Sequence, residues 1–82
     1  MIQHYAKMIK DKEMTPKQAG MSYVMQEIWG QVEEWKQQGS DNASEKKFVT
    51  ALAKIHNQLA DRFVAIGGDT VHIDIETIQI NN

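Results

Sequence analysis

Hydrophobic residues recur every three or four positions along most of this chain, which is the spacing of one face of an α-helix. The pattern predicts three helices, over about residues 2–12, 16–38 and 44–66. The first is short and would need to dock on the others, because an isolated helix of that length is marginal in water. The second and third are long and joined by a short loop, so we expect them to form an antiparallel hairpin.

The predicted second helix has a clear start signal. Thr15 can cap it, Pro16 suits its first position, and Gln18 is placed to complete a capping box. Gly30 lies inside the helix, and one interpretation is that another helix approaches closely there. The apolar stripe is wide and is formed by Met21, Val24, Met25, Ile28, Trp29, Val32 and Trp35.

The predicted third helix is bounded by two small loops. Gly39 suits a left-handed cap at the end of the second helix, and either Asn42 or Ser44 can begin the third. Gly67-Gly68 would end it. Its apolar positions are Phe48, Val49, Leu52, Ile55, Leu59, Phe63, Val64 and Ile66, with His56 among them.

After the third helix the pattern changes to alternation. Val71, Ile73 and Ile75 occupy one set of alternate positions, and polar residues occupy the other. The phase slips near Glu76-Thr77, where a bulge would restore a single apolar face. The segment of about residues 70–80 is therefore predicted to be a β-strand, and it is the single strand that the sequence predicts.

A single strand needs a partner for its backbone donors and acceptors. We therefore expect a mainly α, single-domain protein that forms a homodimer, in which the hairpins build a bundle of four long helices and the strands pair between copies. The alternative is that the strand adds to another protein's sheet. The predicted interaction residues are Met21, Met25, Trp29, Trp35, Val71, Ile73, Ile75, Ile78 and Ile80.

Composition narrows the classes of function. The 82 residues contain no cysteine, which excludes disulfides and thiolate metal sites. The formal net charge of -2 argues against a dedicated nucleic-acid binder, which usually has a basic excess. No apolar run approaches the roughly 18 residues of a membrane span, and the N-terminus lacks the apolar core of a signal peptide. A cytoplasmic location is expected.

Candidate chemistry is sparse. His72, Asp74 and Glu76 share one face of the predicted strand, but three alternate residues spread too far for one metal ion without further ligands. His56 would need a neighbouring acid or nucleophile to act as a base, and a core histidine is the simpler interpretation. The run from Gly67 to Thr70 leaves a helix instead of entering one, so it does not suit phosphate. No catalytic residue, metal or cofactor is predicted.

A short stretch suggests a second class of function. Ala19-Gly20-Met21-Ser22-Tyr23 resembles the turn of a helix-turn-helix motif and is locally similar to that turn in molybdate-responsive regulators. The likeness covers five residues and identifies no family, and the helix after it has no arginine for phosphate or base contacts. It implies a DNA-binding regulator with a degenerate motif around Gly20–Tyr23.

The predicted function is therefore a non-catalytic one. We expect a small cytoplasmic interaction or assembly protein, such as an adaptor, regulator or inhibitor of the kind that phages and mobile elements encode, acting as a homo-oligomer. DNA binding is the alternative.

Overall fold

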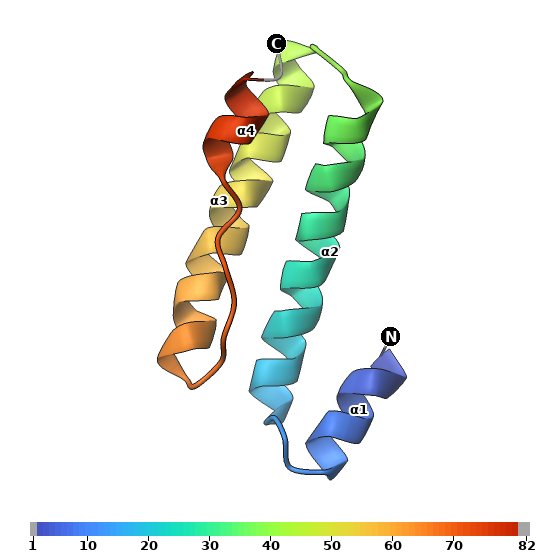
Figure 1. Ribbon diagram of the computed structural model, residues 1–82, viewed down its shortest axis with the longest axis vertical. Coiled ribbons are helices and arrows are strands. Elements are labelled where there is room, and N and C mark those ends of the chain that lie inside the picture. Colours follow the sequence, from blue (N-terminus) through green and yellow to red (C-terminus); the bar gives the residue numbers. More distant parts are fainter. Residues whose placement is uncertain (1, 81–82) are drawn as a thin grey trace.

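The computed structural model of this chain describes the backbone of residues 2–80 and the side chains of residues 2–78. The described part is helical, which confirms the predicted helical character. Figure 1 shows two long antiparallel helices with a short helix folded back beside the start of the first. The elements are α1 (Ile2–Lys10), α2 (Pro16–Gln38), α3 (Ala43–Ala65) and α4 (Ile75–Ile80).

The ends of the long helices follow from local chemistry. Thr15 and Gln18 form the capping box at the start of α2, as their spacing predicts. Gly39 ends α2 in the left-handed conformation, with φ of 67°. Asn42 caps α3 by accepting hydrogen bonds from the backbone amides of Ser44 and Glu45. The first three helices therefore start and stop within two residues of the predicted positions.

The core lies between α2 and α3. Small residues at Ala53 and Ala60 are almost fully buried, so the two helices can approach closely along α3. Large residues from α2 fill the space on either side of them. The buried residues of the hairpin are Ala19, Met25, Ile28, Val32 and Trp35 of α2 and Val49, Ala53, His56, Ala60 and Phe63 of α3.

The predicted C-terminal strand is wrong, and with it the predicted strand pair. In the described part of the chain, residues 71–74 run extended without joining a sheet, and helix α4 begins at Ile75. Asp74 starts this helix, because its side chain accepts a hydrogen bond from the backbone amide of Glu76 at 3.1 Å. The Thr77 hydroxyl and backbone amide both donate to the Asp74 carbonyl. The phase slip near Glu76 is thus a helix start and not a bulge.

A side chain provides the partner that the extended segment needs. The Asn57 side-chain nitrogen donates to the Ile73 carbonyl at 3.0 Å, and its oxygen accepts from the Ile73 amide at 2.8 Å. Asn57 therefore makes the two hydrogen bonds with the Ile73 backbone that a residue of a neighbouring strand would make. This clamp lets Ile73 and Ile78 reach the core, where they are 4% and 0% exposed. His72 adds a contact to Asp61 of α3 at 2.7 Å.

The molecule is flat. Its Cα atoms span 44 × 24 × 15 Å, and α1, α2 and α3 lie side by side in one layer (Figure 1). The segment of residues 67–78 packs on this layer through the buried side chains of Ile73 and Ile78. Residues 67–78 therefore cover one face of the hairpin and leave the opposite face without a second layer in the described part.

We expect Asn57→Ala to lower the free energy of unfolding by about 1–3 kcal/mol, because it leaves two backbone groups of the buried Ile73 without partners. Urea denaturation at a fixed protein concentration measures this. Gln58→Ala is the matched control, since Gln58 is adjacent and exposed, and it should change stability by less than about 0.5 kcal/mol. Equal urea midpoints for the Asn57 variant and the wild type would contradict the clamp.

Candidate functional site

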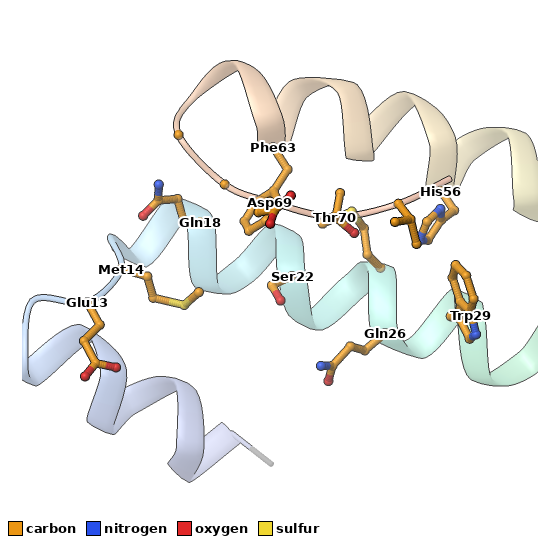
Figure 2. A pocket seen from close by; sticks show the side chains of 14 residues that line it. Glu13, Met14, Gln18, Ser22, Gln26, Trp29, His56, Phe63, Asp69 and Thr70 are labelled. Atoms are coloured by element: carbon orange, nitrogen blue, oxygen red, sulfur yellow. The ribbon is translucent and has the colours of Figure 1, made fainter. Parts of the chain in front are cut away.

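A cavity of about 550 Å³ lies between α2 and the segment that follows α3 (Figure 2). Figure 2 shows Trp29 and His56 at one end of it and Glu13 and Met14 at the other. The wall opposite α2 is the chain from Gly67 to Val71. The cavity therefore exists because the tail returns over the hairpin. The lining residues of α2 are Gln18, Ser22, Met25, Gln26 and Trp29.

The end of the cavity at Trp29 and His56 is aromatic. The Trp29 and His56 rings meet edge to face, with centroids 5.4 Å apart and an angle of 61° between their planes. His56 is 2% exposed, and its Nδ1 is 3.1 Å from the Asn57 side-chain oxygen. That oxygen also accepts from Ile73, so one amide connects the cavity wall to the tail. His56 is therefore placed as a structural residue of the core.

Gly67 and Gly68 let the chain turn over the ring of Phe63. Gly67 has a φ of 97°, in the left-handed region that favours glycine. A Cβ on Gly68 would lie only 2.3 Å from the Phe63 ring. The Gly68 amide donates to the Phe63 carbonyl at 2.9 Å. These two glycines therefore form the exit from α3, as expected from sequence, and place Asp69 and Thr70 on the cavity wall.

The polar groups of the cavity come from several segments. Glu13 lies in the turn between α1 and α2, and Asp69 and Thr70 follow the glycines. Gln18 is already engaged, because its side chain caps α2 and donates to the Ile66 carbonyl at 2.9 Å. The Ser22 hydroxyl is 3.2 Å from that of Tyr5. Ser22 and His56 thus bond to Tyr5 and Asn57, respectively, and these hydrogen bonds do not pair a nucleophile with a base.

The predicted interaction residues fall into different environments. Trp29 and Met25 line the cavity together with Val71, which is 67% exposed. The side chain of Ile80 lies outside the described residues. Of the others, the buried ones are Trp35, Ile73 and Ile78, and the half-buried ones are Met21 and Ile75. Most of the stripe that predicted association is thus occupied within the chain's own core.

The other candidate sites are dispersed. Asp74 starts α4 and His72 pairs with Asp61, and no group of three potential metal-binding side chains occurs among the residues that the structure describes. The stretch around Gly20 lies inside the continuous helix α2, so the helix-turn-helix turn is not formed. A Cβ on Gly30 would have no neighbour within 4 Å, so the expected close approach of another helix is wrong.

Sequence reasoning missed two residues of this region, Asn57, which binds the tail, and Glu13, which lines the cavity. Asn57 was placed on the third helix without a role, and Glu13 was part of an unassigned turn. Asn57 lies one position after the buried His56, at the edge of the apolar stripe, and a short amide there is suited to bind a passing backbone. No signal in the sequence says which segment it binds.

Comparison with protein-family models, curated proteins and solved structures finds no match for this chain. None of the helices within residues 2–80 combines the length and the apolar character that crossing a membrane requires.

We expect Gly68→Ala to destabilise the protein by about 1–3 kcal/mol, since its methyl group would overlap the buried Phe63 ring. Gly30→Ala is the matched control: it adds the same methyl group where there is free space in a helix, and should stabilise by about 0.5–1 kcal/mol. Thermal unfolding of both variants measures the difference. A Gly68 variant as stable as the wild type would show that the turn has spare room.

Proposed function

We propose that this protein is a small interaction or assembly protein that acts as a homodimer, and that two copies meet through the uncovered face of the α2–α3 hairpin. The observation that carries the proposal is a row of apolar side chains on that face. We name it the open face and define it by Met21 and Val24 of α2, Phe48, Leu52, Ile55 and Leu59 of α3, and Ile66, which caps the end of α3.

The position of each residue on α3 separates the open face from the tail. At 3.6 residues per turn, consecutive residues are rotated by about 100°. Ile55 precedes the buried His56, and Asn57 follows it, so these two lie on opposite flanks of the buried row. Asn57 binds the tail, and Ile55 therefore points away from it. Phe48 is one helical repeat of seven residues before Ile55 and lies on the same flank.

Both long helices contribute to the open face. A second cavity of about 370 Å³ is lined by Met21 of α2, by Leu59 of α3 and by Ile66 just after α3, so these side chains share one surface. Lys17 and Arg62 lie beside them. The cavity on the tail side is lined by other α2 residues, including Ser22 and Gln26. The two faces of the hairpin are thus distinct along its length.

Exposure of the open face is high for large apolar groups. Phe48 is 63% exposed, Ile55 47% and Val24 45%. Single exposed hydrophobic residues are ordinary, but a row along a helix is typical of an interaction surface. A domain needs two packed layers to enclose a core, and this hairpin supplies one layer of helices. A second copy provides the other layer.

A homodimer uses the same patch on both copies, so a self-complementary apolar face suits it. Two antiparallel hairpins packed face to face make a bundle of four helices, each of 23 residues. The proposed dimer keeps the bundle of four long helices that the sequence predicts, without the strand pair. It does not involve the tail, whose segment 71–74 binds Asn57 of its own chain. Assembly is then the basis of the function.

We expect the wild type to show twice the 9.4 kDa mass of one chain in size-exclusion chromatography with light scattering. Ile55→Glu should raise the dimer dissociation constant by at least about a hundredfold, because each copy would bring an unpaired carboxylate into an apolar interface. The measurement is the mass across a dilution series.

Val64→Glu is the matched control for this experiment. Val64 is 52% exposed on the same helix, and nine positions after Ile55 it lies about 180° away around the helix axis. It should leave the dimer intact. A wild type that stays monomeric at high concentration, or equal dissociation by both variants, would overturn the proposed dimer.

A further inference from the structure

We propose that the cavity between α2 and residues 67–71 binds a small organic cation, an ammonium group carried on an apolar body. This site lies on the tail side of the hairpin, so the proposal goes beyond the dimer and does not depend on it. The volume of about 550 Å³ falls within the roughly 300–1,000 Å³ that ligand pockets usually have.

The charge of the lining selects a cation. Glu13 and Asp69 are both exposed carboxylates that reach the cavity from different segments, and no lysine or arginine lines it. Neither carboxylate forms an ion pair with another residue in the part of the chain that the structure describes. Two uncompensated carboxylates at one cavity attract a positive ligand and repel an anion.

The aromatic end supplies the second part of the recognition. Trp29 is half-buried, and its ring is held by the edge-to-face contact with His56. Trp29 lies at the opposite end of the cavity from Glu13, so one ammonium group does not contact both; the Trp29 ring is placed to stack on an aromatic ligand body while the ammonium group lies toward Asp69 (Figure 2). Met25 and Phe63 add an apolar surface for the body of the ligand.

Hydrogen-bond acceptors complete the site. An ammonium group has N–H donors only, so it requires acceptors around it. The Asp69 carboxylate and the Thr70 hydroxyl oxygen lie on the segment opposite α2 and supply such acceptors (Figure 2). A neutral ligand of the same shape would leave the carboxylates without a matching charge.

The test is a titration of the labelled protein followed by two-dimensional amide NMR. The probes are phenethylammonium, the neutral phenethyl alcohol and the anionic 3-phenylpropionate, which share one apolar body and differ in charge. We expect phenethylammonium to shift the Trp29 indole signal and the Asp69 and Thr70 amides with saturation. The alcohol should bind at least tenfold more weakly, and the anion should not saturate. The Trp35 indole, in the core, should not move.

Variants locate the charge. Asp69→Asn should weaken phenethylammonium binding by about three- to fivefold, the size expected when an exposed carboxylate loses its charge, and Glu13→Gln, at the far end of the cavity, should weaken it less. Asp41→Asn, an equally exposed carboxylate that does not line the cavity, should change nothing. All three positions are on the surface, so the variants should keep the wild-type spectrum elsewhere.

The outcomes that overturn the proposal are distinct. Equal affinity for the ammonium and the alcohol would mean that the cavity is an apolar pocket without charge selection. Tighter binding of 3-phenylpropionate would reverse the assigned sign. Saturable shifts with ammonium chloride alone would mean a simple ion site, and no saturable shift with any probe would mean that the cavity holds no ligand of this class. None of these results depends on the oligomeric state.

Discussion

The structure depends on one side-chain amide binding one backbone residue. The Asn57 amide offers a donor and an acceptor in the same plane, and it uses both on Ile73. An extended segment must have its backbone groups satisfied before it can be buried, and a single amide does this where no strand is available. The same oxygen lies 3.1 Å from His56 Nδ1. The core, the tail and the cavity wall are therefore fixed at one point.

The helices could be predicted because their signals are local. The Thr15–Gln18 capping box, Gly39 and Asn42 lie within a few residues of the ends they define. The structure of the tail could not be predicted, because a segment as short as Ile75–Ile80 fits both the period of a helix and that of a strand. Alternation from Val71 to Ile75 gave a strand, whereas the buried Ile78 follows Ile75 at a helical spacing of three. Asp74 is a local signal for the start of a helix, but the alternation of apolar and polar residues around it favoured a strand.

The surfaces proposed to bind a second copy or a ligand were harder to predict, since a wide apolar stripe does not say which part faces a neighbour. Met25 and Trp35 were assigned to an interface and are in the core, whereas Phe48 and Ile55 were assigned to a helix stripe and are exposed. The cavity is less predictable still. Glu13 and Asp69 are far apart in sequence, and they line one cavity only because the tail returns along α2.

The tail is held to the hairpin by few contacts. The α2–α3 hairpin contains most of the buried residues, whereas the extended segment of the tail is held by the side-chain amide of Asn57. Docked segments of this kind open locally at a lower free energy than the helices beneath them. Each opening removes the Asp69–Val71 wall and leaves the far side of the hairpin intact. Occupancy of the cavity and the fraction of molecules with the tail docked are thus thermodynamically linked.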